Sequence, residues 1–143
     1  MRPRSSRAVL ALGLLAVSCG GSSTSFPGPV ATVDVTMREY RFDYENRFAA
    51  GRTVVRARNE GELEHQVVLI HLPPEIPSLA EQLRSTERQV VPTVVSLPSR
   101  GPGRSGTFAV DLDPGRYGFV CFVEDPDGQQ HVHKGMSSEF EIL

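Results

Sequence analysis

Hydrophobic and polar residues alternate along much of the chain after residue 30. The alternation has a two-residue period, which is typical of β-strands that bury one face and expose the other. Segments with this pattern are 33–37, 40–44, 55–57, 108–112, 117–121 and 139–142. The segment 67–72 differs because almost all of its residues are apolar, which predicts a central strand covered on both faces.

The strand pattern is interrupted by Pro73 and Pro74, which end the apolar strand because proline cannot donate to a sheet ladder. Ser78 followed by Glu81 matches a capping box, and the apolar residues around them predict a short helix with one buried side. Strand character returns at 90–97, and a loop and a turn are predicted at the Gly- and Pro-rich stretches 99–103 and 113–115.

These patterns give seven to eight short strands and one short helix, separated by turns at short intervals. They predict an all-β protein folded as a β-sandwich. The chain has 143 residues, of which 39% are hydrophobic and 22% charged, so it can bury one ordinary core. We assign residues 30–143 to this domain. Strand parity places Cys121 on the same face as Tyr117 and Phe119, which directs its thiol toward the core.

Residues 1–18 have the features of a secretory signal peptide. Three arginines precede an apolar run at 8–17 that is too short to span a bilayer and ends in small residues. The sequence LAVSC, ending at Cys19, resembles a bacterial lipobox, in which the cysteine becomes the lipidated first residue of the mature protein. The Gly- and Ser-rich segment 19–29 is then a flexible tether. The alternative is an ordinary cleaved signal followed by an incidental cysteine.

The leader predicts an exported protein, periplasmic or at the cell surface, that is anchored to the membrane by lipid. The formal net charge of the whole chain is −2, from 15 basic and 17 acidic residues. Three of the basic residues and none of the acidic ones lie in the leader, so the remaining chain is near −5. It has no basic stripe, and we do not expect nucleic acid as a partner.

Cys121 has no partner within the chain if Cys19 carries lipid, because these are the only two cysteines. A lone thiol in an oxidising compartment is open to oxidation and mispairing. Burial in the core would protect it and needs no further function. Ligation of a metal is the second explanation.

Two histidines and a methionine accompany Cys121 at spacings that suit a metal site. His131 follows Cys121 after nine residues, and Met136 follows His131 after four. His65 stands at the start of the apolar strand and comes from a distant part of the sandwich. A thiolate with imidazoles favours a soft or borderline metal over calcium or magnesium. A trigonal His2Cys set with a weak axial thioether is the blue-copper arrangement, and it suits both oxidation states of copper.

Three segments resemble motifs of the cupredoxins, the family of plastocyanin and azurin. Residues 114–121 (PGRYGFVC) are similar to the PGxYxxxC strand, and residues 131–136 (HVHKGM) to the HxxxGM ending. Residues 59–65 are similar to the N-x-G…H segment that supplies the first histidine. The resemblance covers roughly residues 30–143 and implies a Greek-key β-sandwich with one type 1 copper.

The same resemblance implies a role for each residue and for the protein. His65, Cys121 and His131 are the expected equatorial copper ligands, and Met136 is the expected axial ligand. The implied activity is single-electron transfer with a redox partner protein, without catalysis. Two alternatives use the same sequence: a copper chaperone or sensor that does not transfer electrons, and a metal-free cupredoxin-like module that binds a partner.

The sequence departs from the family pattern at two points. Small cupredoxins have two to four residues between the cysteine and the following histidine, whereas nine stand here. The type 1 site of copper nitrite reductases has a comparably long interval, but that enzyme needs a second copper and a second domain. Gln66 also stands where the family usually has an asparagine that braces the ligand loop.

We interpret several other polar residues as structural and not as metal ligands. In an extended segment His133 points away from His131, so we expect a surface position, with replacement of His131 as ligand as the alternative. His71 lies about 20 Å along the strand from His65 and is expected to be structural. The sequence DPDG from Asp125 is read as a solvated turn, and an acidic rim that steers a positive partner is the alternative.

Overall fold

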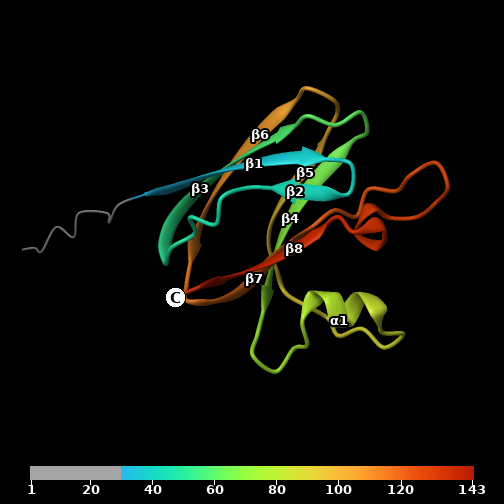
Figure 1. The fold of residues 1–143 in the computed structure, drawn as a ribbon. Helices are drawn as coiled ribbons and strands as arrows, with labels where there is room; N and C mark the ends of the chain where they lie inside the picture. The colour runs from blue at the N-terminus through green and yellow to red at the C-terminus, as the bar shows by residue number, and fades with distance from the viewer. Residues whose placement is uncertain (1–29) are drawn as a thin grey trace, which may run out of the picture.

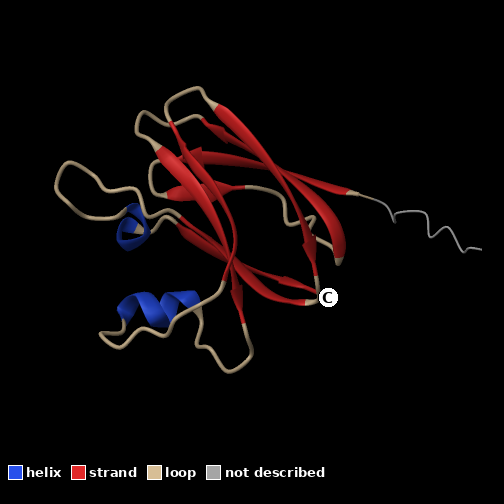
Figure 2. Ribbon diagram, turned by 180° about the vertical axis from the view of Figure 1, so that it is seen from behind, coloured by secondary structure: helices blue, strands red, loops and turns tan. Residues whose placement is uncertain are grey.

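The computed structural model describes residues 30–143, which form two four-stranded β-sheets packed face to face (Figures 1 and 2). The elements are β1 (Ala31–Arg38), β2 (Arg41–Asp43), β3 (Gly51–Asn59), β4 (His65–Leu72), α1 (Leu79–Arg84), β5 (Thr93–Arg100), β6 (Ser105–Leu112), β7 (Gly115–Val120), the 3₁₀ helix η1 (His131–Lys134) and β8 (Ser137–Ile142). The expected all-β sandwich with one short α-helix is confirmed. The expected signal peptide, Cys19 and the tether lie outside the described residues.

The strand order is β2-β1-β3-β6 in one sheet and β5-β4-β7-β8 in the other. Neighbouring strands are antiparallel except for β1 and β3, which run parallel with Ala31 opposite Thr53. The strand β4 lies between β5 and β7, as its uniformly apolar sequence predicted. The last two strands, β7 and β8, pair from Gly115 opposite Ile142 to Val120 opposite Ser137. The long connection between them therefore begins and ends at the same end of the sandwich.

The main core fills the space between the sheets. It contains the inward-facing side chains that the alternation predicted, with a group of aromatic rings around Phe119. The fully or nearly buried members are Val33, Val35, Met37, Phe42, Val55, Ala57, Val67, Leu69, Leu97, Leu112, Tyr117, Phe119, Cys121, Met136, Phe140 and Ile142. Cys121 and Met136 thus extend the core at one end of the molecule.

A second apolar layer covers the outer face of the β4–β7 region. Val68, Ile70 and Leu72 of β4 pack there against Leu79 of α1 and Val132 of η1. The α-helix begins at a complete capping box, in which Ser78 accepts from the backbone N–H of Glu81 and the Glu81 carboxylate accepts from that of Ser78. This layer explains why β4 is apolar on both faces.

Two sequence expectations about strand boundaries were wrong. The alternation at 40–44 predicted a strand, but the strand is limited to Arg41–Asp43. It begins only after Tyr40, which occupies a turn with a φ of 63°. The segment 90–97 was expected to be extended, yet β5 spans Thr93–Arg100. Pro98 falls at a register shift of this edge strand, between the pairs His65–Arg100 and Val67–Leu97, where its missing N–H interrupts no regular ladder.

Among residues 30–143, no helix is long and apolar enough to cross a membrane.

Candidate metal centre

The side chains of His65, Cys121 and His131 come together at one end of the sandwich. His65 is the first residue of β4, Cys121 directly follows β7, and His131 is the first residue of η1. Figure 1 shows the long red loop between β7 and β8 at the end of the molecule where β1 turns into β2. Two separate parts of the chain therefore meet at this point.

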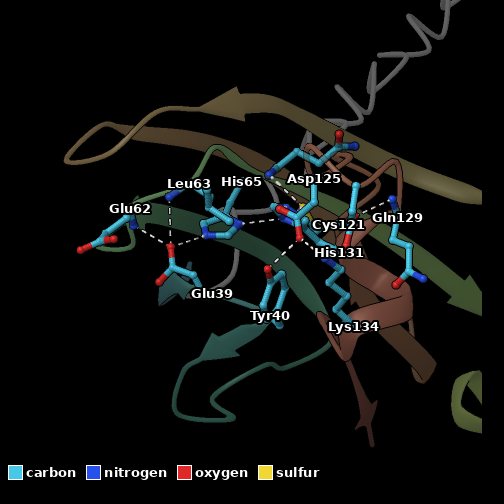
Figure 3. A network of polar contacts seen from close by, with 12 residues as sticks. Glu39, Tyr40, Glu62, Leu63, His65, Cys121, Asp125, Gln129, His131 and Lys134 are labelled. Carbon is cyan, nitrogen blue, oxygen red and sulfur yellow. Dashed lines mark hydrogen bonds and ion pairs between the residues drawn. The ribbon is translucent and has the colours of Figure 1, made fainter.

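The potential ligand atoms of these three residues all lie within 4.8 Å of one another. The two Nδ1 atoms of His65 and His131 are 3.1 Å apart, and Nδ1 of His131 is 3.6 Å from Sγ of Cys121 (Figure 3). All three residues are at most 1% exposed. A compact, buried cluster of two imidazoles and one thiol results.

Asn59 holds the loop that leads to His65. This side chain is completely buried, and its amide donates to the carbonyl oxygens of Leu63 and Arg100 at 2.6 and 2.7 Å. Its carbonyl oxygen accepts from the backbone N–H of Gly61 at 2.9 Å. The N-x-G sequence before His65 therefore acts as a polar brace between the loop and the end of β5.

Backbone hydrogen bonds close the other side of the cluster. The N–H of Cys121 donates to the carbonyl of Met136 at 3.2 Å, and the N–H of Met136 donates to that of His131 at 2.9 Å. The turn between them depends on Gly135, whose φ of 105° lies in the left-handed region that favours glycine. Met136 is fully buried beside this turn. The backbone thus brings Met136 next to both Cys121 and His131.

Burial raises the pKa of the Cys121 thiol, although a backbone N–H of Gln66 points at its sulfur from 3.4 Å. The amide hydrogen bond favours the thiolate, whereas the apolar surroundings favour the thiol. A metal ion that binds the sulfur would displace the proton. Gln66 therefore contributes to this site through its backbone.

His131 is fixed from outside by Asp125. Its Nε2 lies 3.0 Å from Oδ1 of Asp125, while the other carboxylate oxygen accepts from the Tyr40 hydroxyl at 2.7 Å and from Nζ of Lys134 at 2.5 Å (Figure 3). Hydrogen bonds from Lys134 and Tyr40 hold the pKa of Asp125 far below its ordinary value. An ionised carboxylate can only accept, so a hydrogen bond in this contact is donated by Nε2 of His131.

His65 has a looser carboxylate neighbour. Oε1 of Glu39 lies 3.5 Å from Nε2 of His65, and that nitrogen has no hydrogen-bond partner within residues 30–143. The same oxygen accepts from the backbone N–H groups of Glu62 and Leu63 at 2.6 and 3.0 Å. Burial, followed by the proximity of His131, lowers the pKa of His65. At neutral pH the ring is therefore uncharged and available as a ligand.

The donor set fits a soft or borderline metal ion. One sulfur and two imidazole nitrogens converge, and the carboxylates of Asp125 and Glu39 face the outer nitrogens of the two rings. Calcium and magnesium prefer oxygen ligands, whereas copper and zinc accept this combination. Met136 is buried in the same core cluster as Cys121, and its side chain is a thioether, a donor that copper also accepts.

Several sequence-based readings of nearby residues can be compared with this geometry. His71 packs against the Tyr117 ring, as expected of a structural residue. His133 is exposed as expected, but it sits on a 3₁₀ turn, with Nε2 3.3 Å from Arg88, instead of in an extended segment.

The reading of Asp125 as part of a solvated turn was wrong. Its side chain is only 5% exposed, because Tyr40, His131 and Lys134 enclose it. The local DPDG sequence correctly signals a turn, and the N–H of Gly128 donates to the carbonyl of Asp125. In the sequence, the only sign of this contact is that His131 follows Asp125 by six residues.

No protein-family model matches the sequence, and no curated protein sequence matches it either. Solved structures do match. Auracyanin from the photosynthetic bacterium Roseiflexus castenholzii superposes with a TM-score of 0.56 at 20% identity, over 79% of this chain and 97% of that one. Auracyanin A from Chloroflexus aurantiacus, described as a "blue" copper protein, gives 0.56 at 14% identity, over 80% of this chain and 100% of that one. Rusticyanin from Thiobacillus ferrooxidans gives 0.55 at 14% identity, over 82% and 80%.

At these identities the similarity establishes the fold. The chain has the cupredoxin fold, as the three sequence motifs implied.

Proposed function

We propose that this protein is a blue copper protein that carries single electrons, with His65, Cys121 and His131 as equatorial ligands and Met136 as the axial ligand. The observation that carries the proposal is the convergence of two Nδ1 atoms and one Sγ within 4.8 Å in a buried site. The fold supports it, because auracyanin A, a blue copper protein, has the same architecture.

Bound copper would supply one-electron chemistry, accepting an electron from one protein and giving it to another without forming or breaking a covalent bond. The chain's own residues provide a fixed frame for that exchange. The Asn59 brace holds the loop of His65, and the Asp125 carboxylate holds the ring of His131. Burial of all three potential ligands excludes water from the site.

We also propose that the protein works outside the cytoplasmic membrane, tethered by a lipid on Cys19. The proposal rests on the arginine-containing leader and on the cysteine that ends the LAVSC sequence. Expression of the full chain and of Cys19→Ser, followed by fractionation and mass spectrometry, tests it. A lipid mass on the wild-type N-terminus that is absent from Cys19→Ser supports the anchor, and a water-soluble wild type with an unmodified N-terminus contradicts it.

The copper proposal is tested by the visible spectrum of purified protein before and after addition of one equivalent of Cu(II). An intense blue or green band is expected from sulfur-to-copper charge transfer. Cys121→Ser, which changes one ligand atom and little volume, should remove the band. A wild type that stays colourless when loaded with copper overturns the proposal.

Voltammetry then separates electron transfer from copper storage. An electron carrier gives a reversible one-electron wave at an electrode. A protein that binds copper tightly but gives no such wave is a chaperone or sensor, and this result contradicts electron transfer while leaving copper binding intact.

A further inference from the structure

The two histidines of the centre are held in different ways. Nε2 of His131 makes a 3.0 Å contact with a carboxylate oxygen of Asp125, and both side chains are at least nine-tenths buried. Nε2 of His65 lies 3.5 Å from Glu39, outside hydrogen-bonding geometry. The long loop after Cys121 thus supplies His131 with a dedicated partner that His65 lacks.

Asp125 is itself held in place by groups from two parts of the chain. Lys134 and Tyr40 donate to its second oxygen, and the backbone N–H of Asp125 donates to the carbonyl of Gln129 at 2.9 Å. The Tyr40 ring also meets the His131 ring edge-on, with centroids 5.4 Å apart. Tyr40 reaches this position from a left-handed backbone conformation, which is uncommon for an aromatic residue.

We infer that Asp125 is a positioning residue. Held by Tyr40 and Lys134, it fixes His131 as the tautomer protonated on Nε2 and thereby directs Nδ1 toward the metal position. It also favours the oxidised state of the bound ion. The inference rests on the proposed copper site and deepens it. A carboxylate that accepts from the outer nitrogen of a ligating imidazole orients the ring and raises its basicity. Higher electron density on Nδ1 stabilises Cu(II) to a greater extent than Cu(I).

The tautomer can be tested without copper. Protein labelled with ¹⁵N in its histidines and kept metal-free at neutral pH should show His131 with a protonated Nε2 and an unprotonated Nδ1 in two-dimensional ring spectra. His131→Gln identifies the signals by their loss. A wild-type His131 that carries its proton on Nδ1, or that exchanges freely between tautomers, overturns the inference.

The reduction potential tests the second half of the inference. In Asp125→Asn, Cu(II) affinity should fall roughly 10- to 100-fold, with a smaller loss for Cu(I). Each tenfold loss confined to the oxidised state raises the potential by about 59 mV. Asp127→Asn is the matched control, because Asp127 also binds Lys134, at 2.6 Å, is 55% exposed and makes no hydrogen bond or ion pair with His131 in the described structure.

An equal potential in wild type and Asp125→Asn, or an equal rise in both variants, contradicts the inference. A reading of Asp125 as merely structural predicts a loss of stability with no change in potential. If the wild type takes up no copper at all, the proposed function fails, while the tautomer in the metal-free wild type still decides the role of Asp125. The same measurement remains decisive if Asp125→Asn does not fold.

Discussion

The Nδ1 atoms of His65 and His131 lie 3.1 Å apart although 66 positions separate the two residues in the sequence. One belongs to the start of β4 and the other to the loop that follows β7. An ion bound by both rings would therefore connect distant parts of the chain, and it could do so only in the folded state.

Copper should accordingly stabilise the wild type against heat. A ligand that binds only the folded protein adds about 2.7 kcal/mol when its free concentration is 100 times its dissociation constant. We expect the melting temperature to rise on copper addition in the wild type and in His133→Gln, whose histidine is exposed, but not in His65→Gln. Differential scanning calorimetry measures this. An unchanged wild-type melting temperature favours the metal-free module, and a loss of the effect in His133→Gln would indicate that His133 is a ligand.

Asn59→Ala should destabilise the protein by about 1 to 3 kcal/mol, because the substitution leaves buried backbone groups without their partners. The three hydrogen bonds of the Asn59 side chain connect the loop before His65 to β5. Urea unfolding of the metal-free protein measures the cost. Asn46→Ala, at an exposed position, is the control and should change stability by less than about 0.5 kcal/mol. Similar values for the two variants would mean that Asn59 is not a brace.

Phe119→Ala should cost about 3 to 5 kcal/mol in the free energy of unfolding. Phe119 is completely buried and contacts the rings of Phe42, Tyr44, Phe48 and Phe140. The neighbouring Phe122 is 44% exposed, and Phe122→Ala removes the same side chain with a much smaller effect. Denaturant titrations of both variants test the assignment of the aromatic core, which a smaller loss in Phe119→Ala than in Phe122→Ala would contradict.

The charge of Glu39 should make stability depend on pH in acid. The backbone N–H of Leu63, and less strongly that of Glu62, hold the pKa of Glu39 at about 2, below its ordinary value of 4.5. A carboxyl group whose pKa is lower in the folded state stabilises the protein above the unfolded value, and this contribution disappears as the pH falls through the folded value. The advantage of the metal-free wild type over Glu39→Gln should therefore be complete above pH 4.5 and shrink toward pH 2.

Urea unfolding at a series of pH values measures that difference. Glu62→Gln provides the control, since the Glu62 side chain makes no hydrogen bond or ion pair within the described part of the chain. Its stability curve should run parallel to that of the wild type between the same pH limits. A constant difference between wild type and Glu39→Gln over this range would show that the charge of Glu39 contributes nothing.

Local patterns were sufficient to predict most of the sandwich. The two-residue alternation placed the core side chains of β1, β3, β6, β7 and β8, and the apolar sequence of β4 correctly indicated a strand covered on both faces. These predictions succeeded because the sheets bury alternate residues. The end of β5 was missed because Pro98 lies at a register shift, where the usual argument against proline in a strand does not apply.

The candidate metal centre could likewise be predicted only in part from the sequence. Residue type and spacing were enough to single out His65, Cys121 and His131, which the structure brings together. Neither Tyr40 nor Asp125 could be assigned from the sequence, because they meet across 85 positions and each looks locally like part of a strand or a turn. Their positions depend on tertiary contacts, which no local pattern records.

The burial of the three potential ligands also determines how their surroundings respond to a change in charge. Their side chains are at most 1% exposed, and the groups around them include the Tyr40 ring, the backbone amide of Gln66 and the ion pair of Asp125 with Lys134. When one unit of charge is added or removed at such a point, few water dipoles have to turn, and the protein dipoles keep their directions. If the site binds copper as proposed, the energy of rearrangement is small, and an electron exchanged at the ion meets a low barrier.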